Sequence, residues 1–262
     1  MKLLLVGGAG HVGKLITPYL KRQHELRVLD LAPPTEPGVE FVQGSALDPE
    51  VLRRGLDGVD AFVWLAMRNG QGGMSTHQDV ETILNNYDLN TKALHLFLYL
   101  AQEAGVKRGV YTTSMSVHYR ERDFYPTEET VPLDSPSVYG LTKGLGEEIC
   151  AYFARWFGMD ILGLRISGPR TRADFLAQRS TPKRAGDGSF VHPLDEEDMA
   201  NAYLGAVNAL GDQPRYESIY IVGDEKGVEH DLSKAQRLIG WQPRAHLLLD
   251  EAARQQTLPP RG

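Results

Sequence analysis

The amino-acid sequence predicts an α/β fold in which helices cover both faces of a doubly wound parallel sheet. Short, continuous apolar runs alternate with segments of helical periodicity between residues 2 and 166, as parallel strands joined by right-handed crossovers require. A glycine-rich turn follows the first apolar run, and a carboxylate, Asp30, closes the second. Ligands bind at the carboxyl edge of such sheets, so the functional residues are expected there.

The elements can be placed in order along the chain. Each expected strand is a short apolar run, and these runs are Lys2–Val6, Glu25–Asp30, Val39–Gly44, Val59–Ala66, Arg108–Ser114 and Ile161–Ile166. Helices are expected between the strands, at His11–Arg22, Pro49–Gly55, Gln78–Ala104 and Ser137–Phe157. This alternation predicts one continuous sheet up to residue 166.

The sequence changes character after Gly168. A basic stretch, Arg170–Arg184, shows little apolar periodicity and is expected to be a loop. It is followed by an expected helix, strand and helix at Asp195–Leu210, Ser218–Val222 and Leu232–Ile239. We therefore expect a core formed by residues 1–168, and a small cap formed by residues 169–262 that is interleaved with the core.

Composition excludes several classes of protein. The chain has 262 residues and a net charge of −6, which argues against nucleic acid as a partner, because the phosphate backbone demands a basic face. The single cysteine, Cys150, excludes an internal disulfide, and its apolar helical surroundings favour a buried structural thiol. The histidines show no close pairing along the chain, so no metal site is predicted. No apolar segment is long enough to span a bilayer, and we expect a soluble, cytoplasmic protein.

The glycine-rich turn predicts a dinucleotide site. Gly7, Gly10 and Gly13 come directly after a strand and open a helix, so that backbone amides at the helix N-terminus can meet a pyrophosphate. Asp30 stands at the distance along the chain expected for a carboxylate that binds the ribose hydroxyls. The residues after it, beginning with Leu31, are not basic, which favours NAD over NADP. The alternative for Asp30 is a polar residue that ends a strand.

Tyr139 and Lys143 are spaced to lie on one face of a helix. The pair alone could be a phenol beside an ammonium group with no further role. Together with Ser114, which closes an apolar strand, it predicts an acid/base tyrosine whose pKa is lowered by the lysine charge.

These motifs resemble those of the short-chain dehydrogenase/reductase superfamily, in its NAD-dependent epimerase/dehydratase (extended) branch. Further similar segments are Gly44-Ser-Ala-Leu-Asp48, Leu65-Ala-Met67, Asn90-Thr-Lys-Ala-Leu94, Leu164-Arg-Ile-Ser-Gly-Pro169, Phe190-Val-His192 and Leu238-Ile-Gly-Trp-Gln-Pro243. The resemblance implies a Rossmann-type sheet in which residues 1–168 hold NAD and include the catalytic helix. It implies that Ser114 orients a substrate hydroxyl and that Tyr139 removes the hydroxyl proton. Lys143 would hold the nicotinamide ribose, and Asn90 would support a water route for the proton.

The resemblance also implies a set of cofactor-binding residues along the carboxyl edge. They are Gly7, Gly10, His11, Val12, Gly13, Asp30, Leu31, Ala46, Leu47, Asp48, Leu65, Ala66, Met67, Asn90, Tyr139, Lys143 and Ile166.

Among the short members of this branch, the chain resembles uronate dehydrogenases in its length, its Ser114–Tyr139 spacing and its Gly-Trp-Gln-Pro segment. We therefore expect a sugar or sugar-acid hydroxyl as the substrate, with Met115, Ser116, His118, Arg172 and Arg179 as candidate substrate residues. An arginine of the basic stretch could bind a carboxylate, or the stretch could be a solvated lid. His118 and Tyr119 could line the pocket or only pack the loop. Arg165 is expected to be structural, because it lies within a strand.

Two alternatives remain open at this point. One is a nucleotide-sugar epimerase or dehydratase, which uses the same groups. The other is an NAD(P)-binding sensor without turnover, since fold does not imply function. A homodimer through the long helices is also expected as a possible assembly.

Overall fold

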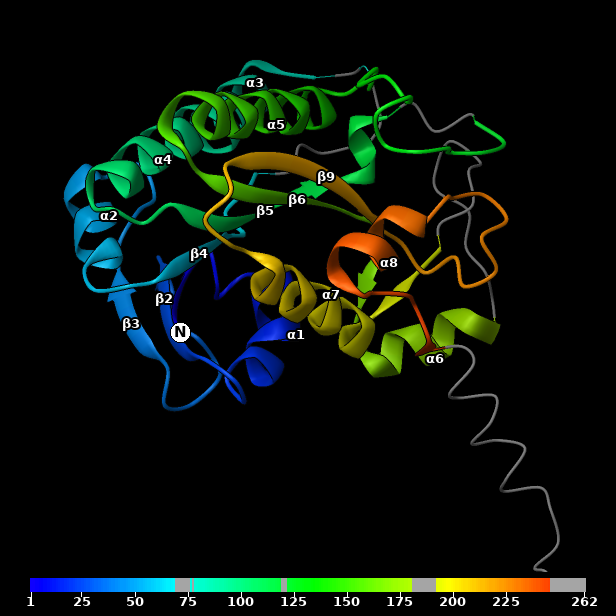
Figure 1. The fold of residues 1–262 in the computed structure, drawn as a ribbon, viewed down its shortest axis with the longest axis horizontal. Helices are drawn as coiled ribbons and strands as arrows, with labels where there is room; N and C mark the ends of the chain where they lie inside the picture. The colour runs from blue at the N-terminus through cyan, green and yellow to red at the C-terminus, as the bar shows by residue number, and fades with distance from the viewer. Residues whose placement is uncertain (69–75, 77, 119–121, 181–191, 246–262) are drawn as a thin grey trace, which may run out of the picture.

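A seven-stranded parallel sheet forms the centre of the protein, here described from a computed structural model (Figure 1). The structure describes residues 1–68, 76, 78–118, 122–180 and 192–245, without the side chains of residues 179 and 180. The strands have the order β3-β2-β1-β4-β5-β6-β9. Their bounds are Lys2–Val6 (β1), Glu25–Asp30 (β2), Glu40–Gln43 (β3), Ala61–Trp64 (β4), Arg108–Ser114 (β5), Asp160–Ile166 (β6) and Arg215–Ile221 (β9). The predicted fold class is confirmed.

The sheet is buried on both faces. Along β1, Leu3 and Leu5 belong to one apolar cluster, whereas Leu4 and Val6 belong to another, because successive side chains of a strand point to opposite faces. On the first face lie α1 (His11–Leu20) and α7 (Glu196–Ala209); on the second lie α2 (Pro49–Leu56), α4 (Leu94–Glu103) and α5 (Val138–Phe157). The two layers of helices leave the carboxyl edge of the sheet as the place for a ligand.

The segment after residue 168 contributes to these core layers as well as to the expected cap. Strand β9 pairs in parallel with β6 along its whole length, from Asp160↔Arg215 to Ile166↔Ile221. The strand expected at Ser218–Val222 is therefore the edge strand of the core sheet. The remaining parts of this segment include a short sheet of β7 (Pro169–Arg170) with β8 (Leu194–Asp195), and helix α8 (Ser233–Ile239).

The long helix expected at Gln78–Ala104 is divided in the structure. Helix α3 (Val80–Tyr87) begins after Asp79, whose carboxylate accepts a hydrogen bond from the N–H of Thr82 at 2.7 Å. A π-helical segment, η1 (Asp88–Ala93), separates α3 from α4. Such wide turns occur often at functional sites, and this one contains the buried Asn90.

The basic stretch that was expected to be a loop contains a helix, α6 (Arg172–Ser180), so this prediction was wrong. Thr171 caps it: its hydroxyl accepts a hydrogen bond from the N–H of Asp174 at 3.1 Å and donates one to the Asp174 carboxylate at 2.8 Å. Phe175 is buried, but Asp174 and Leu176 on either side of it are exposed. One buried side chain gives little periodicity, which is why the helix was missed.

Within the described residues, no helix is long and apolar enough to cross a membrane.

Candidate active site

A cleft of about 1500 Å³ lies at the carboxyl edge of the sheet. Residues at the ends of β1, β2, β4, β5 and β6 border it, together with residues from the segments that follow β6 and β9. The sequence-predicted residues that line this cleft are Gly7, Gly10, His11, Val12, Gly13, Asp30, Leu31, Ala46, Leu47, Leu65, Ala66, Met67, Ser114, Met115, Ser116, Tyr139, Lys143 and Ile166.

The turn after β1 has the shape of a cradle for a dinucleotide. Gly7 has a φ of 84°, and a Cβ at this position would lie 2.6 Å from the backbone nitrogen of Ala66, so no larger residue fits. A Cβ on Gly13 would lie 2.1 Å from the carbonyl oxygen of Gly8. Helix α1 begins at His11 with no side-chain cap, which leaves the amides of its first turn for an anion in the cleft. These residues fit the pyrophosphate of NAD.

Asp30 connects the end of β2 to this cradle. Its carboxylate accepts hydrogen bonds from the N–H of Ala9 at 2.9 Å and from the N–H of Leu31 at 2.7 Å. The side chain is partly exposed and lines the cleft, so it keeps acceptor sites for ribose hydroxyls.

Replacing Asp30 with alanine is therefore expected to lower the ratio of kcat/KM for NAD to that for NADP by roughly 10- to 100-fold, the value of a hydrogen bond to a charged group. The matched control is Asp48→Ala. Asp48 accepts hydrogen bonds from the N–H groups of Glu50 and Val51 as the N-cap of α2 and does not line the cleft. Asp48→Ala should cost about 1 kcal/mol of stability and leave the cofactor ratio unchanged. A wild-type preference for NADP would contradict the role assigned to Asp30.

Ser114 and Tyr139 meet at the base of the cleft. Ser114 ends β5, and Tyr139 lies in the first turn of α5, whose N-cap Ser137 accepts a hydrogen bond from the N–H of Gly140 at 3.0 Å. A Cβ on Gly140 would lie 2.0 Å from the carbonyl oxygen of Ser116, so this glycine lets α5 pack tightly on the segment after β5. The close packing brings the Tyr139 hydroxyl near enough to the Ser114 side chain to affect the pKa of Tyr139.

Burial controls the ionisation of the pair on α5. It raises the pKa of Tyr139 to about 12, and the hydrogen bond with Ser114 opposes this shift. Burial also lowers the pKa of Lys143 to about 7, and the Lys143 ammonium donates a hydrogen bond to the carbonyl oxygen of Thr112 at 2.6 Å. The expectation that Lys143 holds the pKa of Tyr139 below its usual value is thus not met in this structure, because burial raises that pKa.

Asn90 lies behind the cleft rather than in it. Its Oδ1 accepts a hydrogen bond from the N–H of Arg68 at 2.9 Å, and its Nδ2 donates to the Arg68 carbonyl and to the Thr142 hydroxyl, each at 3.0 Å. The side chain is fully buried. Asn90 therefore joins the segment after β4 to the catalytic helix, and its part in a proton route stays a prediction.

His118 does not line the cleft. It is buried beneath the site, with Nδ1 at 2.8 Å from the carbonyl oxygen of Pro132 and Nε2 at 3.1 Å from the Arg165 guanidinium. Burial and the neighbouring Arg165 charge lower its pKa to about 4. Of the two roles considered for His118, lining the pocket and packing the loop, the second fits this placement. Tyr119 lies outside the described residues.

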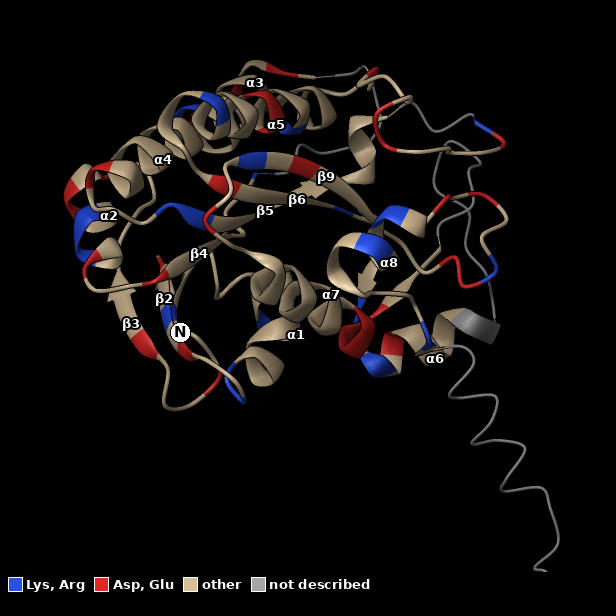
Figure 2. Cartoon of the chain, viewed as in Figure 1, with Lys and Arg blue, Asp and Glu red and all other residues tan. Residues whose placement is uncertain are grey.

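Arg172 is also placed away from the cleft. It forms ion pairs with Asp195 at 2.7 Å and with Glu197 at 2.9 Å, and Figure 2 shows the acidic first turn of α7 beside the basic start of α6. Its charge is already neutralised, so it does not serve as the carboxylate ligand that was expected. The side chain of Arg179 lies outside the described residues, as do Lys183 and Arg184.

Arg165 has the structural role expected for it. Its guanidinium donates to the Glu147 carboxylate from Nε at 3.0 Å and from Nη2 at 2.6 Å. The hydroxyl of Thr113, next to Ser114 on β5, donates to the same carboxylate at 2.8 Å. This buried pair fixes α5 against β5 and β6 directly below Ser114 and Tyr139.

Sequence reasoning did not assign several residues that line the cleft. They are Arg68, Arg122, Asp123, Tyr125, Arg170, His192, Glu229 and His230. Most come from segments that meet only in the folded chain, so local spacing carries no signal for them. Arg170 could have been identified from the sequence, because it begins the basic stretch directly after β6.

The fold and the cleft define a dinucleotide-binding protein with a serine, a tyrosine and a lysine beside the cofactor cradle. The chain belongs to the NAD-dependent epimerase/dehydratase family, whose model matches residues 3–184. The family and its cofactor, NAD, were predicted from the sequence and are confirmed.

Individual relatives have several activities. The chain is 32% identical to a 3 beta-hydroxysteroid dehydrogenase/Delta 5-->4-isomerase of Mycobacterium tuberculosis, over 64% of this chain and 46% of the relative. It is 32% identical to a uronate dehydrogenase of Pseudomonas syringae pv. tomato, over 63% of this chain and 58% of the relative. The chain thus spans about half the length of these curated relatives. Its fold resembles that of a mutant uronate dehydrogenase from Agrobacterium tumefaciens complexed with NAD, with a TM-score of 0.74, 21% identity, and coverage of 99% of this chain and 91% of that one.

Proposed function

We propose that the protein is an NAD-dependent oxidoreductase that oxidises a ring hydroxyl of a sugar acid such as a hexuronate. The observation that carries this proposal is that Ser114, Tyr139 and Lys143 line the same cleft as the glycine cradle and Asp30. A reacting hydroxyl and a dinucleotide can therefore be held side by side.

The roles of the residues follow from their chemistry. Ser114 and the Tyr139 hydroxyl, which lie near one another and line the same cleft, can both bind the substrate hydroxyl. Tyr139 takes the proton from that hydroxyl as general base. NAD, when bound, accepts the hydride. Lys143 lies one helical turn from Tyr139 and is placed to bind the nicotinamide ribose. A positive charge at this point would lower the pKa of Tyr139 from the value that burial imposes.

Arg170 is the residue we assign to the substrate carboxylate in place of Arg172, and Arg179, whose side chain lies outside the described residues, remains a proposed alternative. It lines the cleft, and its guanidinium donates to the Gln178 side chain at 3.0 Å and to the carbonyl oxygen of Pro169 at 2.8 Å. Both partners are neutral, and within the described part of the chain no carboxylate forms an ion pair with it. An arginine whose charge is not neutralised can bind a carboxylate strongly. Met115 and Ser116 line the same cleft and remain proposed substrate contacts.

The test compares kcat/KM, from the absorbance of NADH, for a hexuronate, its parent aldose and a UDP-sugar. We expect the hexuronate to be preferred. Arg170→Met should lower kcat/KM for the hexuronate by roughly 10- to 100-fold, the value of one charge-assisted hydrogen bond, with little effect on the aldose. Arg172→Ala, on the adjacent helix, is the matched control and should leave the hexuronate-to-aldose ratio unchanged. Indifference to the carboxylate, or preference for the UDP-sugar, would reject the sugar-acid substrate.

The same assay separates the alternatives. The family includes epimerases and dehydratases, which convert a substrate without net release of NADH. Turnover of a UDP-sugar without NADH would therefore identify that activity. The relation to a steroid dehydrogenase makes a hydroxysteroid the proper addition to the panel. Binding of NAD without turnover of any of these substrates would support the remaining alternative, an NAD(P)-binding sensor that is not an enzyme.

We also propose a homodimer through the long helices, and the cytoplasm as its location. Large apolar side chains are exposed along one face of α5, at Leu141, Leu145, Tyr152 and Trp156. Their spacing places them on a single stripe, which a second copy of the chain could cover. Light scattering on the purified protein tests this, and a monomer at micromolar concentration would reject it.

A further inference from the structure

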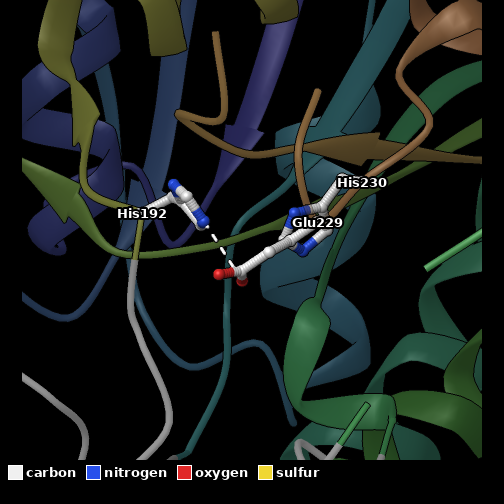
Figure 3. Close-up of side chains that lie close together, drawn as sticks. All are labelled: His192, Glu229 and His230. Atoms are coloured by element: carbon white, nitrogen blue, oxygen red, sulfur yellow. Dashed lines mark ion pairs between the residues drawn. The ribbon is translucent and has the colours of Figure 1, made fainter. Parts of the chain in front are cut away.

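Two histidines and a glutamate meet at the border of the cleft. His192 lies just before β8, whereas Glu229 and His230 lie in the segment between β9 and α8. One potential ligand atom from each residue lies within 4.8 Å of the other two. Figure 3 shows the His192 ring and the Glu229 carboxylate pointing toward one another, with His230 beside them. We propose that these residues bind a divalent transition-metal ion such as Zn²⁺, which sequence spacing did not predict.

The separations suit a small, tetrahedrally bound ion. Nε2 of His192 lies 3.2 Å from Oε2 of Glu229. Zinc bonds to nitrogen and oxygen are about 2.0–2.2 Å long in tetrahedral geometry, which places two ligand atoms roughly 3.3 Å apart. The widest spacing in the cluster, within 4.8 Å, would shorten to that value by side-chain rotation, for which the 32% exposure of the Glu229 side chain leaves room.

His230 is oriented by a buried carboxylate. Oδ2 of Asp224 lies 3.3 Å from Nδ1 of His230, so that Nδ1–H donates to it and Nε2 is left as the ligand atom. Histidines that bind metals in proteins almost always have such a partner, which fixes the ring and raises its basicity. Asp224 also accepts the backbone N–H of Glu229 at 2.8 Å and that of His230 at 3.0 Å. One carboxylate therefore fixes the backbone of both neighbouring ligands.

Contacts with Tyr125 also hold the segment that carries Glu229 and His230 in place. The His230 ring stacks on Tyr125, with ring centres 4.9 Å apart and an angle of 2° between the planes. The N–H of Tyr125 donates to the carbonyl oxygen of Glu229 at 2.6 Å, and the N–H of Asp231 donates to the carbonyl oxygen of Tyr125 at 2.9 Å. The backbone of Glu229 and the ring of His230 are thus preorganised without an ion, which lowers the cost of binding.

The donor set selects the class of ion. Two imidazole nitrogens and one carboxylate suit Zn²⁺ and related transition metals, whereas Ca²⁺ and Mg²⁺ prefer an all-oxygen set. The carboxylates of Glu229 and Asp224 balance the charge of a divalent ion. Three protein ligands leave a coordination position open, and because the cluster borders the cleft, that position faces a ligand there. The site does not depend on the proposed oxidation of a sugar acid.

Cobalt and zinc titrations test the site directly. After chelation and dialysis, the wild-type protein is titrated with Co²⁺ while visible absorption is recorded, and with Zn²⁺ in a calorimeter. We expect one ion per chain and the intense visible bands of four-coordinate Co²⁺, which Zn²⁺ then abolishes. Absence of these bands together with absence of stoichiometric Zn²⁺ binding overturns the proposal, and this measurement needs no variant.

Variants then assign the ligands. His192→Ala, Glu229→Gln and His230→Ala should each weaken Zn²⁺ binding by at least 10-fold, and Asp224→Asn by roughly 10- to 100-fold. The matched control is His95→Ala, because His95 is exposed on α4, beside Tyr152, and its loss should not change the affinity. NAD binding shows that each variant is folded. Unchanged affinity in the folded variants of all three ligands would overturn the assignment even if the wild type binds Zn²⁺.

Discussion

Replacing Tyr139 with phenylalanine is expected to lower kcat by roughly 10²–10⁴-fold, the usual contribution of a general acid or base. Phenylalanine keeps the largely buried ring and removes only the oxygen that lies near Ser114. The cradle at Gly7 and Gly13 and the Asp30 carboxylate are unchanged, so NAD should bind with nearly the wild-type affinity. Single-turnover kinetics and NAD titration by fluorescence measure the two effects separately.

The control is Tyr111→Phe. Tyr111 is also fully buried and lies in β5, and its hydroxyl donates to the carbonyl oxygen of Lys143 at 3.3 Å, but it does not line the cleft. Its loss should lower stability without comparable loss of kcat. Near-normal turnover by purified Tyr139→Phe would show that the reaction does not use this phenol.

Replacing Glu147 with glutamine should destabilise the protein by about 3–5 kcal/mol, the cost of leaving one partner of a buried ion pair without the other. The Arg165 and Glu147 side chains are 5% and 3% exposed, so water cannot solvate the guanidinium that remains. Glutamine has nearly the same volume, so loss of packing does not explain the effect. Chemical denaturation at neutral pH, monitored by circular dichroism, measures it.

The adjacent residue provides the control. Glu148 is exposed on the same helix, and Glu148→Gln should change the free energy of unfolding by no more than about 0.5 kcal/mol. Equal stability of the two variants would mean that the Arg165–Glu147 pair contributes no more than a surface pair.

Most of the fold could be predicted because a parallel strand buried on both faces has a simple sequence pattern. The runs at Lys2–Val6, Glu25–Asp30 and Arg108–Ser114 appear in the structure with the same bounds. The position of β9 in the sheet could not be predicted in this way, since hydrophobic periodicity does not show which strand a given strand pairs with. The wide turn at Asp88–Ala93 has no sequence signal for the same reason.

The candidate site divides along similar lines. The residues at the cofactor end of the cleft could be predicted from sequence motifs, because a tight turn needs glycine and a helix repeats every 3.6 residues. The other end of the cleft is built from Tyr125, Arg170, His192 and His230, which come from four separate segments. Arg172 shows the limit most clearly: its charge and position suggested a ligand, but the nearby Asp195 and Glu197 could not be foreseen from spacing.

The pairing of β6 with β9 also bears on the order in which the chain is assembled. During synthesis β6 is complete long before Arg215–Ile221 is made, and until then one side of β6 has no neighbouring strand from this sheet. An uncovered edge exposes unpaired backbone groups that can recruit another chain. Strand β9 therefore covers the edge of β6 and becomes the edge of the sheet in its place, whereas a nascent or truncated chain that stops before Arg215 presents β6 as a template for aggregation.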